Sequence, residues 1–416
     1  IMTLIYGLIN TDFYHDQYQF PVKAQCYTEC KKFIDKFYDS SDCTNSDFEH
    51  LEMTYEEVKA FEGVFNEVLS LNKDRFIEDL FNKRMDIGSL KLEFHKDNRY
   101  MLMYECSLAP DQNKRVTLLG LTHRKNSARE YGCSVEKNGN RQEDTFLISY
   151  ILKYMISGYF THSMYFPTAR TGYVLTYKSL IGSAVKDKFN IGISRKNLLT
   201  RPNSDFLAKL SELTRSNLTD DEWFGINGTR PAVNIIENNI IQGQILISDM
   251  PVQDILYQPY GTETQLPMFV TSGVVTEMTP LLLFFRNEIV QTVLIEEPEI
   301  SLHPKLQCEI ARGLIRLSNS DIPVFMTTHS DIILQHINNM IKLAASPGCK
   351  VIGEKLGYEE CDWIDRERVN VYQFEVNDSH TTNVKKLPCG DFGFEAMTFY
   401  DTLKELNMQT TIIEEA

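Results

Sequence analysis

Two adjacent carboxylates at the end of a short apolar segment are the residues of this sequence best suited to chemistry. The segment Thr292–Ile295 runs directly into Glu296 and Glu297. Such a segment predicts a buried strand, and α/β folds bind ligands at the carboxyl ends of their strands. Because neighbouring strand residues point to opposite sides, one acid can hold Mg²⁺ while the other activates a water that attacks a phosphate. The alternative is an acidic strand end that only faces solvent.

A histidine after a second apolar segment favours the first of these interpretations. The strand predicted over Val324–Thr327 leads through Thr328 to His329. An imidazole at the end of a neighbouring strand can reach the same phosphate and water from the side. A lone histidine in this place is more often structural, and its spacing from the two acids is what favours a catalytic role.

A Ser-Gly pair offers a third group suited to phosphate. Ser272 and Gly273 come just before the helix predicted over Glu277–Ile289. A hydroxyl, a glycine that allows close backbone approach and the free N–H groups of a helix start all favour a bound anion. A plain helix cap is the alternative, and it would be the better explanation if the pair stood alone.

Together these segments resemble the ATPase heads of the ABC superfamily, specifically the soluble RecF/OLD-like branch of the AAA-15/AAA-21 type found in bacterial anti-phage defence systems. The sequence reads EEPEISLHP over 296–304 and THS over 328–330, as in that branch. Residues 166–172, FPTARTG, are similar to an LPAxRTG element of the same proteins. The resemblance implies an α/β fold, an ABC-ATPase head (mixed sheet with covering helices) with helical and small antiparallel β insertions.

The resemblance also implies a role for each candidate residue. Glu296 is similar to the Walker B acid on the metal side, Glu297 to the catalytic glutamate and His329 to the switch histidine. The cofactors that it implies are ATP and Mg²⁺. Four further residues, from the signature motif and the D-loop, are expected to contact the nucleotide: Ser272, Gly273, Ser301 and His303.

The phosphate-binding P-loop of such heads does not occur in these 416 residues, because no GxxxxGK[ST] motif is present. In the family that resembles this chain, the loop precedes a helix near the start of the head. The apolar segment Ile1–Ile9 resembles that helix, and we therefore expect a strand and a P-loop to precede Ile1. The rival interpretation is a degenerate head that does not hydrolyse ATP.

Composition and charge narrow the class of protein. Hydrophobic residues make up 43% and charged residues 24%, which is typical of a globular chain and excludes a wholly disordered one. The net charge of −15 argues against DNA binding over the whole surface, but it leaves room for a local basic patch. The nine cysteines include no CxxC pair, and no segment reaches the ~20 apolar residues that span a bilayer. We expect a cytoplasmic protein with reduced thiols and no membrane contact.

The pattern of elements predicts five regions. They are the start of the ATPase head (1–20), a helical and β insertion or arm (21–160), a helical lobe with a small antiparallel β unit (161–265), the ATPase core (266–345) and a C-terminal β/α extension (346–416). Further predicted helices cover Pro21–Met85, Thr145–Phe160, Lys305–Leu317 and Phe394–Leu406. Further predicted strands cover Leu90–Phe94, Tyr100–Cys106, Arg115–Leu119, Ser163–Phe166, Val233–Ile240, Ile245–Ser248, Ile255–Gln258, Val369–Glu375 and Asn383–Leu387, and Arg124–Glu143 is expected to be a loop.

The leading functional interpretation is an ABC-type ATPase that works as a switch or sensor in a head-to-tail homodimer or higher homo-oligomer. By the resemblance, it would control a separate effector protein, a nuclease or toxin, after a nucleic acid or phage protein trigger. The residues after His329 are too few for the Toprim nuclease domain of OLD proteins, and Asp362 and Asp365 are expected in a solvated loop. The alternatives are a non-hydrolysing scaffold for an effector subunit and a RecF/OLD-like DNA repair ATPase.

Overall fold

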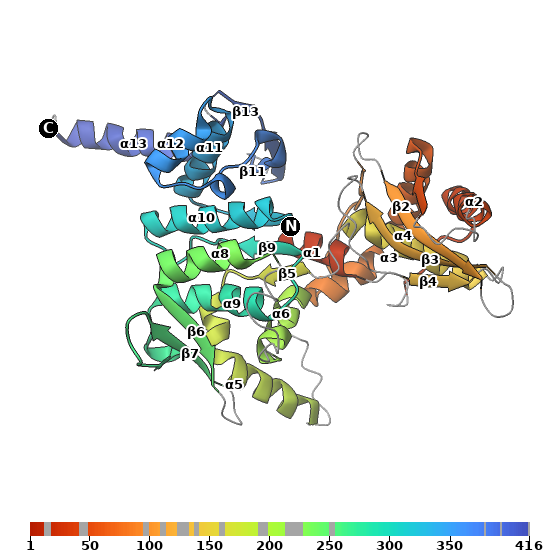
Figure 1. The fold of residues 1–416 in the computed structure, drawn as a ribbon, viewed down its shortest axis with the longest axis horizontal. Coiled ribbons are helices and arrows are strands. Elements are labelled where there is room, and N and C mark those ends of the chain that lie inside the picture. Colours follow the sequence, from red (N-terminus) through yellow and green to blue (C-terminus); the bar gives the residue numbers. More distant parts are fainter. Residues whose placement is uncertain are drawn as a thin grey trace. The chain divides into compact units, whose positions relative to one another are not determined.

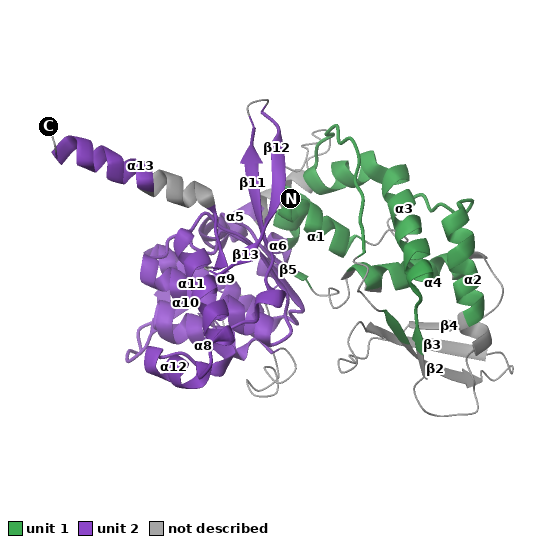
Figure 2. Ribbon diagram, turned by 90° about the horizontal axis from the view of Figure 1, so that it is seen from above, with its two compact units in different colours: residues 1–163, 190–205 green, residues 164–189, 206–416 purple. Residues whose placement is uncertain are grey.

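The chain folds into two compact units of mixed α/β structure. The computed structural model describes residues 1–11, 18–40, 49–94, 100–108, 114–122, 133–136, 141–157, 163–189, 199–212, 228–248, 254–377, 380–391 and 393–414 (Figure 1). Unit 1 consists of residues 1–163 and 190–205, and unit 2 consists of residues 164–189 and 206–416 (Figure 2). Helices and small sheets occur in both units, and the predicted α/β class is confirmed.

Unit 1 combines packed helices with an antiparallel sheet. Its helices are α1 (Met2–Asn10), α2 (Gln25–Ser40), α3 (Tyr55–Phe81) and α4 (Arg141–Ser157), and α6 (Arg201–Ser211) begins in it. Its strands pair antiparallel in the order β1 (Glu49–Glu52), β2 (Met101–Leu108), β3 (Lys114–Thr122) and β4 (Cys133–Glu136). Much of the loop predicted over 124–143 lies outside the described residues, and β4 occupies part of it.

The long helix α3 organises unit 1. It begins with a capping box, in which the Thr54 hydroxyl accepts from the Glu57 N–H and the Glu57 carboxylate accepts from the Thr54 N–H. Its apolar residues recur at helical spacing and are buried where α3 packs against α1, α2 and α4. The contact with α1 is close at Gly7, where an added Cβ would lie 2.4 Å from Leu80 Cδ1.

Unit 2 contains the sheet that carries the candidate residues. Its strand order is β10 (Val324–Thr327), β9 (Thr292–Glu296) and β5 (Ser163–Phe166), and β9 and β10 are parallel. Helix α10 (Pro304–Asn319) connects them, as the β-α-β pattern predicts, and β9 lies between α10 and α9 (Gly273–Asn287) in Figure 1. Helix α5 (Arg170–Phe189) packs on α9, and α11 (Asp331–Ala345) packs on α10.

The segment Val233–Ile240 is helical, so the strand predicted there is wrong. Helix α8 (Arg230–Ile235) continues into a π-helical stretch over Ile236–Ile241. Pro231 favours a helix start because its ring presets φ, and the apolar side chains of the segment belong to the main core of unit 2. Burial against α9 and α10 therefore overrides the β-propensity of its isoleucines.

A small antiparallel sheet follows this helix, as predicted. It consists of β6 (Gly243–Ile247), β7 (Ile255–Pro259) and β8 (Leu266–Pro267). In unit 1, by contrast, Leu90–Phe94 forms no strand, and β1 interrupts the predicted helical stretch Pro21–Met85. The Asn66 side chain bonds both the N–H and the C=O of Leu92, so these backbone groups need no strand partner.

The C-terminal part of unit 2 forms α12 (Cys349–Leu356), a ribbon of β11 (Val371–Val376) and β12 (Thr382–Leu387), the pair β13 (Cys389–Gly390) and β14 (Gly393–Phe394), and α13 (Met397–Glu414). Asp365 is exposed, as predicted, but Asp362 is fully buried. Arg312 and Arg316 of α10 each approach its carboxylate to 2.6 Å. The predicted solvated loop is therefore wrong at Asp362, because two guanidinium groups compensate the buried charge.

Two further observations concern the described part of the chain. None of the helices that it contains is long and apolar enough to cross a bilayer. The cysteines whose side chains are described there are unbridged: Cys26, Cys30, Cys308, Cys349, Cys361 and Cys389.

Candidate functional site

The two candidate acids lie at the carboxyl end of β9, next to the carboxyl end of its parallel neighbour β10. Glu296 is paired with Thr327 in the register of the two strands. The Glu297 N–H donates to the Thr327 carbonyl at 3.0 Å, so the contact extends one residue beyond β9. Glu297 itself has φ 44°, in the left-handed region that few residues other than glycine adopt. A strained backbone of this kind is frequent at functional sites, which marks the turn after β9.

His329 lies beside Glu297. Its Nε2 is 3.8 Å from Glu297 Oε1, too far for a hydrogen bond but close enough for both groups to contact one small molecule. The His329 side chain is 84% exposed and that of Glu297 is 32% exposed, so both are accessible from solvent. The structure therefore brings together the acid and the histidine that the sequence predicts.

Glu299 fixes the segment that carries His329. Its Oε1 accepts hydrogen bonds from the Thr328 hydroxyl at 3.0 Å and from the His329 N–H at 2.6 Å. Its Oε2 is buried and has no hydrogen-bond partner among the described residues. Sequence reasoning gave this residue no role, although its place in the EEPE motif was a signal that could have identified it.

Thr168, which follows β5, and Arg170, the first residue of α5, also contact the two acids. The Thr168 hydroxyl donates to Glu296 Oε2 at 3.0 Å. Arg170 is fully buried, and its guanidinium donates to the backbone carbonyls of Glu296 at 2.7 Å and Glu297 at 3.1 Å. The sequence marked this FPTARTG segment only as a resemblance, without a role for either residue.

Arg170 also pairs with Glu277 of helix α9. The two side chains are 2.9 Å apart, and both are buried. Burial lowers the pKa of the Arg170 guanidinium, while the nearby carboxylates of Glu277, Glu299 and Glu297 oppose that shift. Because an arginine stays charged over the whole physiological range, its positive charge compensates the surrounding acids.

Ser272 and Gly273 lie at the start of α9, which begins four residues before the predicted start at Glu277. The Ser272 hydroxyl accepts from the Val275 N–H at 3.4 Å, as a helix cap does. An added Cβ on Gly273 would lie 3.4 Å from the Ser301 hydroxyl, so the two motifs meet in one chain. Ser301 is exposed and has φ 61°. It is therefore the second left-handed residue, after Glu297, in the segment between β9 and α10. The described residues show no hydrogen bond from Ser272 to either acid.

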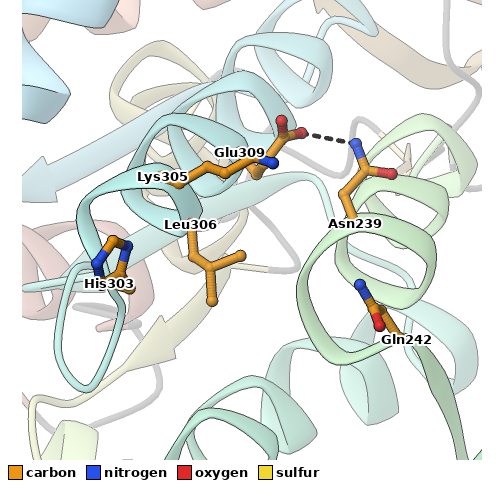
Figure 3. Close-up of a pocket in the computed structure, with 6 residues that line it drawn as sticks. All are labelled: Asn239, Gln242, His303, Lys305, Leu306 and Glu309. Carbon is orange, nitrogen blue, oxygen red and sulfur yellow. Dashed lines mark hydrogen bonds between the residues drawn. The ribbon is translucent and has the colours of Figure 1, made fainter.

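His303 lies apart from these groups. It is the exposed residue before α10, and its side chain lines a cavity of about 450 Å³ between α10 and the π-helical stretch (Figure 3). Across this cavity the Asn239 amide donates to Glu309 at 2.7 Å. The remaining lining residues are Gln242, Lys305 and Leu306.

A comparison with protein families matches residues 3–334 to the AAA_15 family, described as an AAA ATPase domain. The chain belongs to this family. The match confirms the AAA-15 type of ATPase that the motifs resemble, and it contains every candidate site residue. A search of curated proteins finds no match.

Solved structures similar to this AAA_15 chain include heads of SMC proteins. One comes from work on the ATP-driven dimerization and DNA-stimulated activation of SMC ATPases (11% identity, 45% of this chain and 98% of that one, TM-score 0.28). A second is an SmcHead bound to the C-winged helix domain of ScpA (10%, 70% and 74%, 0.29). A third is an Smc head domain with an extended coiled coil bound to the C-terminal domain of ScpA, from Pyrococcus furiosus (12%, 74% and 79%, 0.28).

ATPases of this family bind ATP, typically together with Mg²⁺. Among the described residues no group of three or more acidic, histidine or cysteine side chains could hold a metal ion. Mg²⁺ in nucleotide sites is commonly held by one or two carboxylates, with phosphates and water completing the shell. Glu296 fits this arrangement, because Thr168 holds one oxygen of a carboxylate that stands at the strand end.

Proposed function

We propose that this AAA_15 protein binds and hydrolyses ATP, with Glu296 on the Mg²⁺ side and Glu297 as the base. The observation that carries the proposal is the approach of Glu297 to His329, at the strand ends where Thr327 fixes the backbone of the acid. Mg²⁺ held at Glu296 would neutralise charge on the β- and γ-phosphates. The chemistry is phosphoryl transfer to water, in which positioning and electrostatics supply most of the acceleration.

Each side chain then has a defined task. Glu297 orients the attacking water and accepts its proton as the bond to the γ-phosphorus forms and the bond to the leaving ADP oxygen breaks. His329 contacts the γ-phosphate from the side, and Glu299 holds the histidine backbone in place. Thr168 keeps the Glu296 carboxylate in one orientation. Tasks of this kind require the exposure that Glu297 and His329 have.

The proposal extends to a head-to-tail homodimer or higher homo-oligomer in which two chains share each ATP. Ser272, Gly273 and Ser301 would contact the nucleotide held by the other subunit. The contact between Gly273 and Ser301 supports this role, because it joins both motifs into one surface. The exposed Phe269 and Val270, which lie three and two residues before Ser272, enlarge that surface with apolar area suited to a protein partner. His303 would contact nucleotide only at the edge of this surface.

We further propose that ATP turnover makes the protein a switch for a separate effector, a nuclease or toxin, in cytoplasmic anti-phage defence. The trigger would be a nucleic acid or a phage protein. The ribbon β11–β12 supports an effector contact, because Tyr372, Phe374, Val376 and Val384 are exposed on it. Exposed apolar groups of this kind are frequent where partner proteins bind.

Steady-state ATP turnover by the full-length protein tests the proposed activity. We expect Mg²⁺-dependent hydrolysis in the wild type and a loss of about 10²-fold or more in kcat for Glu297→Gln, with ATP binding retained, because only the base is removed. Glu263→Gln, a change at an exposed acid of the same unit, serves as the control and should leave turnover unchanged. Binding without turnover in the wild type would instead identify a non-hydrolysing scaffold.

A further inference from the structure

Arg170 is the largest fully buried side chain of the described residues, and it connects two elements that the proposed reaction uses. One of its neighbours is helix α9, which begins at the Ser272–Gly273 pair. The other is the end of β9, which carries Glu296 and Glu297. A buried guanidinium needs a hydrogen-bond acceptor or a negative charge near each of its N–H groups, since its desolvation is otherwise costly.

The contacts of Arg170 meet most of this requirement, and they come from both elements. Its Nε lies 2.9 Å from Glu277 Oε2 on α9. Its two terminal nitrogens donate to the Glu296 and Glu297 carbonyls at 2.7 and 3.1 Å, and one of them also donates to the Pro167 carbonyl. The link to α9 is an ion pair and the links to the strand end are hydrogen bonds, so α9 and the strand end cannot move apart without weakening one of them.

Thr171 strengthens the connection on the α9 side. Its N–H donates to Glu277 Oε1 at 3.2 Å, and its hydroxyl is 2.9 Å from that of Thr276. Thr276 lies one turn after Ser272, and its hydroxyl also donates to the Gly273 carbonyl at 3.0 Å. A short chain of hydrogen bonds therefore runs from the first turn of α9 to the segment that carries Arg170.

Arg170 also contacts the backbone of Glu297, which has an unusual, left-handed conformation. A residue such as Glu297 stays in the left-handed region only where its surroundings determine the conformation. The Arg170 bond to the Glu297 carbonyl and the Thr327 bond to the Glu297 N–H hold the two sides of this residue. The direction of the Glu297 side chain thus depends on a group that is itself attached to α9.

We propose that Arg170, with Glu277, is the positioning residue that couples the first turn of α9 to the acids Glu296 and Glu297. When a second subunit or nucleotide displaces the start of α9, the guanidinium carries the displacement to the carbonyls of both acids and re-aims the Glu297 carboxylate. The inference rests on the proposed ATPase function and deepens it. It assigns Arg170 no contact with substrate.

The test removes the connection while keeping the interior neutral and filled. In Arg170→Met/Glu277→Gln, methionine fills the buried volume, and the glutamine carbonyl can still accept from the Thr171 N–H. We expect kcat to fall by about tenfold or more, since small misplacements of reacting groups can cost up to ~10²-fold. The dissociation constant for ATP should stay close to wild type, because the charged pair is replaced together and leaves no uncompensated charge. The melting temperature should fall, because three backbone carbonyls lose their donor.

The other end of α9 supplies a matched control. Arg286 and Glu237 form an ion pair of the same 2.9 Å length there, and the hydrogen bonds and ion pairs described for Glu296 and Glu297 do not include them. Arg286→Met/Glu237→Gln should keep the wild-type kcat, whatever it does to the melting temperature. Equal losses of kcat in both double variants would overturn the inference, because they would show a general effect on α9.

A second variant covers the case in which the double variant fails to fold. Arg170→Lys keeps the positive charge beside Glu277, but one ammonium group cannot hold both carbonyls as the planar fork does. We expect a reduced kcat with ATP affinity unchanged. Wild-type kcat in Arg170→Lys would overturn the inference while the wild-type turnover itself stands. A wild-type protein without any turnover would remove the proposed function, and the inference with it.

Discussion

Glu296 and Glu297 are neighbours in the chain, but their surroundings differ. Glu296 has one carboxylate oxygen held by Thr168, whereas Glu297 has one oxygen near the exposed His329. A fixed carboxylate suits a metal ion, because its geometry is already set before the ion binds. An accessible carboxylate beside a histidine suits proton transfer to or from a water.

The two acids should therefore respond differently to the loss of charge. We expect Glu296→Gln to raise the Mg²⁺ concentration needed for half-maximal nucleotide binding by about tenfold or more, because a hard cation loses an anionic ligand. Glu297→Gln should leave that concentration unchanged. Titrating nucleotide binding with Mg²⁺ checks this prediction, and small, equal shifts in both variants would indicate a merely solvated strand end.

His336 gives a residue-scale prediction about pH. It is buried on α11, where burial lowers its pKa; Glu309, Arg312, Asp362 and the Tyr358 ring also face it. The unfolded chain binds a proton near pH 6.5 that the folded state takes up only at lower pH. The contribution of the neutral, buried His336 to the free energy of unfolding is therefore complete above about pH 6.5. It decreases as the pH falls below that value.

Urea unfolding between pH 7 and pH 5 measures this effect. We expect the free energy of unfolding to decrease over this range in the wild type, and to decrease less in His336→Leu, which has no group to protonate. His303→Asn, a change at an exposed histidine, should keep the wild-type pH dependence. An unchanged slope in His336→Leu would contradict the prediction.

At the scale of elements, prediction from the sequence succeeded where the signals were local. The strands β9 and β10, the connecting helix α10 and the ribbon strands β11 and β12 lie where the sequence predicts them. The acids and His329 could be named as candidates for the same reason, since they lie at or just after the ends of apolar strands. The helix over 230–241 was missed because its isoleucines favour a strand until the core around them is known.

Contacts between parts of the chain that are distant in sequence could not be predicted from such local signals. Arg170 and Glu277 are separated by more than a hundred residues, and an arginine in a sequence normally indicates an exposed position. The same reason explains Asp362, whose partners Arg312 and Arg316 lie on a helix far earlier in the chain. Buried ion pairs are visible only after the elements have been assembled.

The packing of α1 on α3 supports a prediction about stability. We expect Gly7→Ala to lower the free energy of unfolding of unit 1 by ~1–3 kcal/mol, because the new methyl group would collide with the buried Leu80 side chain. Gly88→Ala, where an added Cβ meets nothing within 4 Å, is the control. Adding Leu80→Val to Gly7→Ala should recover part of the loss, and a fully stable Gly7→Ala protein would contradict the close approach.

At the scale of the whole molecule, the core of unit 2 extends beyond the family match, which ends at residue 334. Ile364, Leu387 and Phe394 belong to the same buried cluster as the strands β5 and β9. The Asn338 side chain bonds both the N–H and the C=O of Phe394. The segment from Ile364 to Phe394 therefore contributes to the folded core of this head.

A shared site would make two inactive proteins complement each other. Ser272→Arg should damage the surface offered to the partner's nucleotide, and Glu297→Gln should damage the subunit's own base. Mixed in equal amounts, they should recover turnover up to about a quarter of wild type, because half of randomly formed dimers contain one intact site of two. ATPase assays of the mixture check this, paired with sizing of the Glu297→Gln protein with ATP. A strictly monomeric wild type with normal turnover would exclude a shared site.

The left-handed backbone at Glu297 has a consequence for how such heads evolve. Glycine adopts φ 44° without the cost of roughly 1–2 kcal/mol that a side chain with a Cβ incurs there. Under the proposed mechanism, selection for hydrolysis would retain the acid despite this cost. In a lineage that uses the head only for binding, drift towards Gly at position 297 would increase stability at no functional loss. The residue at this one position would then distinguish working ATPases from descendants that have lost the reaction.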